Sequence, residues 1–264
     1  FSKKKENTNF CGRLVQSILF ADYQFVWFQD DKKLFEERNL QIKNNKTKFF
    51  ISGPLMTGDG DWLKYKQADL RSEIFANNVD KNIKIWICIF DLPTLDKKFK
   101  SYRAVLNRFS IEMQDKFFYD LILLLKKYDN IGLIYKPKRR INKKRFYLGA
   151  NLLKFLNLKN DVNYYKRIVF LPNNIDPYIP FAISDNCIGV PFTSAVFAGN
   201  YYNKDSIFYD PLNIFKDCYP QKYHNLCFSN FIDLSKIVEH WILEKDKHKN
   251  KNKLKINPVN QFQK

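Results

Sequence analysis

The chain has 264 residues, 45% of them hydrophobic, which is enough apolar material to bury a sizeable core and excludes disorder as the default. Its 45 basic and 27 acidic side chains give a net charge of +18, so the partners it attracts are phosphates, nucleic acid or anionic lipid. Five scattered cysteines without a C-x-x-C pair indicate a reducing compartment, and no apolar run reaches the roughly 18 residues that span a bilayer. We therefore expect a cytoplasmic protein, peripheral at most to the inner membrane face.

The first 47 residues are the least regular part of the chain. Residues 14–28 are apolar and aromatic without clean periodicity, and the chain begins at Phe1 rather than Met. We interpret residues 1–47 as a linker or the remnant of an N-terminal domain in a processed or truncated product. Residues 48–52 (KFFIS) predict a strand that opens a second domain over 48–244, and a basic tail follows at 245–264.

From residue 83 onward, predicted strands alternate with predicted helices. A continuous apolar run predicts a strand at 83–90, and apolar residues at helical spacing predict a helix at 111–128. Further strands are expected at 131–135 and 167–171, with a helix at 146–158 between them.

The alternation continues to the end of the domain. Short strands are expected at 187–190 and 206–209, and helices at 179–184, 192–198 and 237–243. Repeated alternation over about 160 residues is typical of an α/β fold with a doubly wound, Rossmann-like parallel sheet.

In such sheets ligands bind beyond the carboxyl ends of the strands, so the loops that follow the predicted strands are the candidate sites. Lys136, Lys138 and Arg139 follow one strand, and their charges suit a diphosphate; a solvated basic loop is the alternative. Thr193 and Ser194 open a predicted helix whose N–H groups suit an anion, although capping alone would explain them. We expect these two stretches to converge from neighbouring strands on one phosphate.

Several short elements, taken in order, resemble the C-terminal half of GT-B glycosyltransferases. They are Gly53-Pro54 with Asp59 and Asp61, Phe90-Asp91, Lys136-Pro137-Lys138, Ile183-Ser184-Asp185, Thr193-Ser194 and Ile207-Phe208-Tyr209-Asp210. The resemblance covers roughly residues 49–211. It is greatest to bacterial surface-polysaccharide enzymes, including CDP-glycerol glycerophosphotransferase-like, sialyltransferase-like and Kdo-transferase-like proteins.

The resemblance implies transfer of a sugar or polyol phosphate from a nucleotide-activated donor to a cell-surface glycan such as a capsule. It places the donor phosphates on Lys136, Pro137, Lys138, Thr193 and Ser194, and the charge of the basic loop adds Arg139 to this set. It places the donor nucleotide, or the loops around it, at Gly53, Asp59, Asp91, Asp185 and Asp210. A His often stands where this chain has Lys138, so the nucleotide stays open. The catalytic base is expected in the preceding half of such enzymes and is unknown here.

Two alternatives remain open beside this interpretation. Asp59-Gly60-Asp61 matches the D-x-D pattern that holds Mg²⁺ or Mn²⁺ in GT-A enzymes, but three residues often match by chance, and we expect no metal or other cofactor. The second alternative is a non-catalytic basic module that binds RNA or DNA by phosphate contact and stacking, although no nucleic-acid motif supports it. A third hypothesis is an inactive transferase-like domain that serves as a structural partner. In the favoured reading the basic chain ends lie near an anionic membrane surface.

Overall fold

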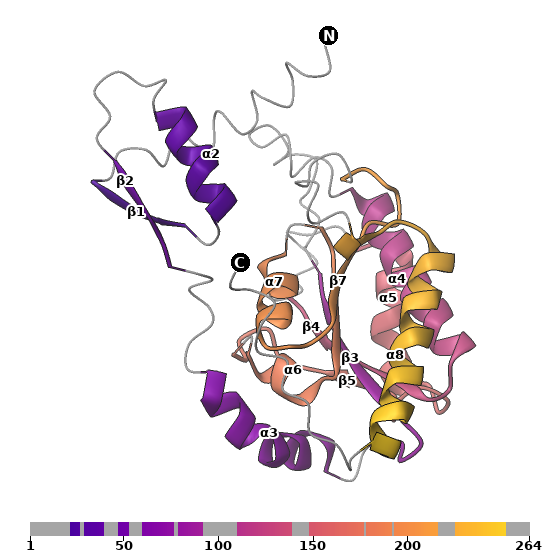
Figure 1. The fold of residues 1–264 in the computed structure, drawn as a ribbon. Coiled ribbons are helices and arrows are strands. Elements are labelled where there is room, and N and C mark those ends of the chain that lie inside the picture. The colour runs from indigo at the N-terminus through magenta and orange to yellow at the C-terminus, as the bar shows by residue number, and fades with distance from the viewer. Residues whose placement is uncertain are drawn as a thin grey trace.

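The computed structural model describes ten stretches of the chain, arranged as two separate parallel sheets with helices (Figure 1). The described residues are 22–26, 29–39, 47–52, 60–76, 79–91, 110–138, 148–176, 178–191, 193–215 and 225–251.

The larger sheet has six strands, all parallel to their neighbours. They lie in the order β5-β4-β3-β6-β7-β8. Their bounds are β3 (Ile85–Phe90), β4 (Ile131–Lys136), β5 (Ile168–Phe170), β6 (Asn186–Gly189), β7 (Ser206–Tyr209) and β8 (Cys227–Phe228). This arrangement confirms the expected doubly wound parallel sheet, and five of its six strands were predicted to within two residues at either end.

Helices cover both faces of this sheet (Figure 1). On one face lie α4 (Ile111–Lys127), α5 (Ala150–Asn157), continued by the short 3-10 helix η3 (Leu158–Asn160), and α8 (Phe231–Lys251). On the other lie α6 (Tyr178–Ile183), α7 (Ser194–Tyr201) and α3 (Gly60–Phe75), which packs on α6. The strands β3 and β4 are consequently buried along their whole length, which is why β3 and residues 131–135 of β4 are without charged residues.

Local sequence signals explain the helix α4 and its fit to the sheet. The Ser110 hydroxyl oxygen accepts a hydrogen bond from Met113 N at 3.1 Å and caps the helix, and Lys126 and Lys127 occupy its last turn. Its inner face places Phe118 among a cluster of aromatic rings that includes Tyr135 at 5.6 Å between centroids. The core is thus centred on α4 and β4.

A glycine in β4 is required by the packing of the opposite face. A Cβ atom at Gly132 would lie 2.4 Å from the ring of Trp86, so no larger residue fits. The same ring stacks on Phe75 of α3 at 4.6 Å between centroids, which attaches α3 to the larger sheet.

The smaller sheet consists of β1 (Tyr23–Val26) and β2 (Lys48–Ile51), connected by α2 (Gln29–Asn39). We expected residue 48 to begin the Rossmann-like domain, but β2 pairs with β1 and not with the larger sheet. Helix α2 covers one face, where Phe35 stacks on Phe49 at 5.8 Å. The strand that the sequence predicted is therefore present, in a different sheet from the expected one.

The helix α8 also crosses an expected boundary. We placed the start of a basic tail at residue 245, but the helix continues to Lys251. Lys245 lies within it and bonds to Asp185 at 2.8 Å, so this residue belongs to the folded domain.

Candidate phosphate-binding site at the carboxyl edge of the sheet

The order of the strands reverses direction at the pair β3 and β6. From β3 the chain adds β4 and β5 on one side, then crosses back to place β6, β7 and β8 on the other. In open parallel sheets the crevice at the carboxyl ends of such a pair is where ligands bind. The residues that follow β3, β4 and β6 are therefore the candidate site.

Asp91 follows β3 and is almost entirely buried. One carboxylate oxygen accepts a hydrogen bond from the Tyr135 hydroxyl at 2.8 Å, and the other accepts one from the backbone N–H of Lys138 at 3.2 Å. Burial raises the pKa of the Asp91 carboxyl, and the two hydrogen bonds and the nearby Lys136 ammonium oppose that rise without cancelling it. Asp91 thus ties the end of β3 to the turn after β4.

Lys136 is the last residue of β4 and is only 7% exposed. Its ammonium donates a hydrogen bond to the carbonyl oxygen of Asn173 at 3.2 Å. Burial lowers the pKa of Lys136, while the carboxylates of Asp91 and Asp176 favour the charged form. This buried side chain therefore connects β4 to the loop after β5.

Lys138 is the exposed member of the basic turn. Its backbone is held by Asp91, so the position of its side chain is set by the end of the neighbouring strand. Arg139, the third predicted cation, lies outside the described residues.

Thr193 and Ser194 lie where β6 leads into α7, at the same edge. The Thr193 hydroxyl donates to the carbonyl oxygen of Val190 at 2.8 Å, so its one proton is used within its own turn. Gly189 lies beneath it, and a Cβ there would be 2.4 Å from the Thr193 oxygen. Ser194 is the first residue of α7 and is half-buried. The helix start, with Ser194, is the anion-suited part of this segment.

We expected the two predicted phosphate-binding stretches to follow neighbouring strands. They lie at the same edge of the sheet, but the strands that they follow are not neighbours. The strand β3 lies between β4 and β6. Phe90 at its end accepts a hydrogen bond from the backbone N–H of Val190 at 3.0 Å, while Asp91 accepts from Lys138. The end of β3 therefore separates the basic turn from the start of α7 and bonds to both segments.

Asp210 follows β7 at this edge and is fully buried. Its carboxylate accepts a hydrogen bond from the backbone N–H of Phe215 at 2.7 Å, and Asn213, at φ 53°, completes the turn. Burial raises the pKa of Asp210, and the N–H groups of the turn oppose it. Asp210 shapes the loop after β7.

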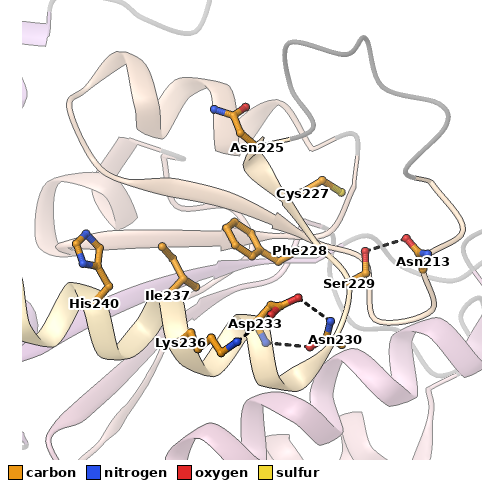
Figure 2. Close-up of a pocket in the computed structure, with 10 residues that line it drawn as sticks. All are labelled: Asn213, Asn225, Cys227, Phe228, Ser229, Asn230, Asp233, Lys236, Ile237 and His240. Atoms are coloured by element: carbon orange, nitrogen blue, oxygen red, sulfur yellow. Dashed lines mark hydrogen bonds and ion pairs between the residues drawn. The ribbon is translucent and has the colours of Figure 1, made fainter.

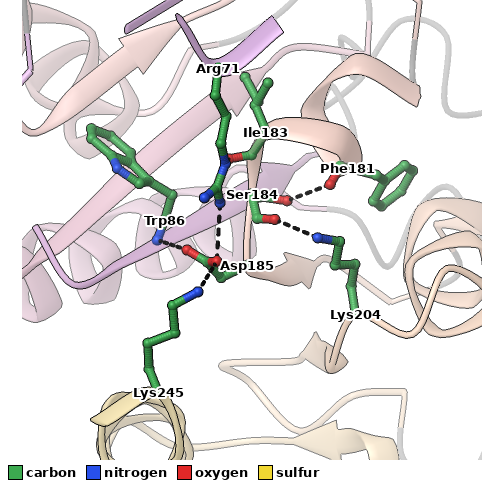
Figure 3. A network of polar contacts seen from close by, with 8 residues as sticks. All are labelled: Arg71, Trp86, Phe181, Ile183, Ser184, Asp185, Lys204 and Lys245. Carbon is green, nitrogen blue, oxygen red and sulfur yellow. Dashed lines mark hydrogen bonds and ion pairs between the residues drawn. The ribbon is translucent and has the colours of Figure 1, made fainter. Parts of the chain in front are cut away.

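Asp185 is not brought together with the other predicted residues, because it precedes β6 and lies at the amino edge of the sheet. Figure 3 shows it bonded to Arg71 of α3 at 3.0 Å, to Lys245 of α8 at 2.8 Å and to the backbone N–H of Trp86 at 2.8 Å. Burial alone would raise the pKa of Asp185, but the two cations and the N–H outweigh it and hold the pKa below its usual value. Sequence reasoning did not find this cluster of contacts.

The remaining predicted residues are not placed. Gly53 and Asp59 lie outside the described residues, and Asp61 lies in α3 with its side chain undescribed. Among the residues that the structure describes, no three His, Cys, Asp or Glu side chains gather as a metal site would require. Within the same described stretches, no helix has the length and apolar character needed to cross a bilayer.

A separate concave pocket of about 550 Å³ lies between the edge strand β8 and the first half of α8 (Figure 2). Polar and apolar surface contribute about equally to it, and the capping pair Asn230 and Asp233 forms part of its wall through a 2.7 Å hydrogen bond. Its lining comprises Asn213, Asn225, Cys227, Phe228, Ser229, Asn230, Asp233, Lys236, Ile237 and His240. None of the predicted donor-binding residues lines it.

The fold described above is that of a doubly wound α/β domain, a class in which ligands bind at the carboxyl edge where the strand order reverses. The model of the family described as polysaccharide biosynthesis PFTS motif protein matches residues 6–238. The chain belongs to this family, which confirms the expected link to polysaccharide biosynthesis. No curated protein matches the sequence.

Solved structures similar to this chain include a polymerase and a synthase. The wall teichoic acid polymerase TagF aligns over 87% of this chain and 52% of its own, with 13% identity and a TM-score of 0.47. A TagF variant soaked with CDPG aligns over 87% and 51%, with 14% identity and a TM-score of 0.49. The catalytic domain of starch synthase IV from Arabidopsis thaliana, bound to ADP and acarbose, aligns over 90% and 51%, with 13% identity and a TM-score of 0.42. This chain spans about half the length of each.

Proposed function

We propose that this chain is the donor-binding half of a GT-B type transferase that passes a sugar or polyol phosphate from a nucleotide-activated donor to a polysaccharide. The observation that supports the proposal is that Lys138 and the start of α7 follow the strands on either side of β3, at the edge where the strand order reverses. Membership of a polysaccharide-biosynthesis family supports the reaction class.

Each part of the edge has a chemical role in this proposal. The Lys138 ammonium neutralises charge that develops on the departing nucleotide, and the N–H groups at the start of α7 donate to its phosphate oxygens. The buried Lys136 adds positive potential. Removal of the acceptor proton requires a base, and we assign that base to the half that GT-B enzymes carry before this domain.

Titration calorimetry with CDP-, CMP-, UDP- and GDP-linked donors tests the proposal. We expect one of them to bind, and Lys138→Ala to weaken that binding about 10-fold, since a charge-assisted contact to phosphate is lost. Lys159→Ala is the matched control, because Lys159 is an exposed lysine in η3. Absence of binding by every donor would overturn the proposal.

A gel shift, read together with these titrations, separates this function from the nucleic-acid alternative. A gel shift with random RNA and DNA oligonucleotides at low salt should show at most weak, sequence-independent retention by a chain of charge +18. Tight binding of oligonucleotides together with no response to nucleotide donors would favour the basic module instead.

A further inference from the structure

The end of β3 is the structural link between the two halves of the proposed donor site. Lys138 follows β4 and Ser194 follows β6, and these strands are separated by β3. The backbone of Phe90 bonds to Val190 on one side, and the side chain of Asp91 bonds to the turn of Lys138 on the other. The distance between the cation and the helix start therefore depends on these two residues.

The backbone bond would form with any residue at position 90, but the bond on the other side depends on a carboxylate. Asp91 Oδ1 accepts from Lys138 N at 3.2 Å, and Asp91 Oδ2 accepts from the Tyr135 hydroxyl at 2.8 Å. Tyr135 is 1% exposed and packed among aromatic rings, so its hydroxyl fixes the orientation of the carboxylate.

We propose that Asp91, oriented by Tyr135, is the positioning residue that holds the turn of Lys138 at the right distance from the start of α7 to bind a diphosphate. The proposal rests on the proposed function, because it concerns the same site. Asp91 does not itself touch the phosphates in this arrangement. It acts through the backbone of Lys138.

The charge of Asp91 makes this proposal distinguishable from a simple electrostatic effect. If Asp91 influenced an anionic ligand through its charge alone, Asp91→Asn would remove repulsion and tighten binding. A positioning role predicts the opposite sign, because an amide offers one acceptor oxygen where the carboxylate offers two, so the Lys138 N–H and the Tyr135 hydroxyl can no longer both donate to this side chain.

The experiment compares Tyr135→Phe and Asp91→Asn with a matched pair elsewhere in the core. Tyr209 and Asp120 are also buried, and the Tyr209 hydroxyl donates to Asp120 at 2.6 Å, but Asp120 lies in α4, away from the basic turn. Tyr209→Phe removes the equivalent hydroxyl from a pair away from the basic turn, and Asp120→Asn neutralises a carboxylate that also pairs with Lys116 at 2.6 Å. The probes are inorganic pyrophosphate, the nucleoside diphosphate that the wild-type chain binds best, and the matching nucleoside.

We expect Tyr135→Phe and Asp91→Asn to weaken binding of pyrophosphate and of the nucleoside diphosphate about 5- to 10-fold, the effect of losing a hydrogen bond that orients a contact. Nucleoside binding should stay unchanged, and the two control variants should lower Tm without altering any affinity. Unchanged or tighter diphosphate binding would overturn the proposal, and so would an equal loss for nucleoside and diphosphate, which would indicate general destabilisation. If the wild-type chain binds none of the probes, the proposed function itself fails.

Discussion

At the scale of single residues, buried charges in this protein are held by backbone groups and by partners from distant parts of the chain. Asp185 joins α3, β3 and α8, and Lys204 donates to the carbonyl oxygen of the adjacent Ser184 at 2.9 Å. A carboxylate held by two cations and an N–H is favoured in its charged form. Its contribution to stability must therefore depend on pH.

We predict that Asp185→Asn destabilises the protein by about 1–3 kcal/mol at pH 7, since two charge-assisted bonds are lost. The folded-state pKa of Asp185 is below its usual 3.8, so the carboxylate stabilises the fold above that pH, and this contribution is lost as the pH falls through the folded-state pKa. Urea unfolding should show that the difference in unfolding free energy between variant and wild type shrinks from pH 7 to pH 3.

The control is Asp246→Asn, which breaks an exposed pair with Lys84 and should cost less than about 1 kcal/mol. A difference that grows towards pH 3 would contradict this assignment.

A second prediction at this scale concerns Gly132. Gly132→Ala should destabilise the protein by about 1–3 kcal/mol, because the new methyl group would overlap the Trp86 ring and force it away from Phe75. Thermal unfolding measures the loss, and the fluorescence of Trp86 should change with it. Combining Gly132→Ala with Trp86→Leu should recover part of the stability, and an unchanged cost in the double variant would rule out this steric cause.

At the scale of elements, the clearest sequence signals belong to strands that are buried on both faces. The sequence of β3 and residues 131–135 of β4 carry no charged side chain, a pattern typical of strands covered on both faces. The strand β1 has four residues and a mixed burial pattern, so its sequence shows neither a continuous run nor a clean alternation. The helix α3 was missed because its apolar residues do not gather on one clear helical face, and its attachment depends on Arg71 and on a ring from another strand.

Part of the candidate site was predictable because the position of a residue before or after a strand fixes the edge of the sheet at which it lies. Asp91 and Asp210 follow strands and lie at the carboxyl edge, whereas Asp185 precedes β6 and lies at the other edge, a difference that is visible in the sequence itself. The contacts of Asp91 with Tyr135 and Lys138 could not be predicted, because they depend on which strands become neighbours.

The last carbonyl groups of α4 are bound by a buried arginine from another part of the chain. Arg167 is buried and donates hydrogen bonds to the carbonyl oxygens of Leu125 and Tyr128 at the end of the helix and of Ile131 in β4. Arg167→Met should cost about 2–4 kcal/mol, because these carbonyl groups lose their charged donor inside the core. Urea unfolding checks the value. Lys166→Met, at the exposed neighbouring position, should change stability by less than about 0.5 kcal/mol.

At the scale of the whole molecule, the two sheets differ in how completely they are covered. The larger sheet is enclosed by helices, whereas Tyr23, Phe25 and Phe50 expose 60%, 62% and 46% of their surface on one side of the smaller sheet. The helix α3 belongs to the larger sheet, since it packs on α6 and bonds to Asp185.

We therefore predict that a fragment of residues 60–251 unfolds cooperatively at a higher Tm than a fragment of residues 79–251. The shorter fragment lacks Arg71 and Phe75, so it leaves Trp86 uncovered and Asp185 with one cation fewer. Circular dichroism during heating compares the two fragments. Equal Tm values would show that α3 adds nothing to the larger sheet.

The reversal of strand order at β3 has a consequence for synthesis on the ribosome. Asp185 accepts a hydrogen bond from the backbone N–H of Trp86 in β3, although it lies 99 residues after Trp86 in the chain. The strand β6, which pairs with β3, begins directly after Asp185. At about 5–20 residues per second, the ribosome needs roughly 5–20 s to make this stretch, and until then one edge of the central strand has no partner. The half with β4 and β5 can assemble during that interval, so nascent chains stalled before residue 186 should present an unpaired apolar edge to chaperones.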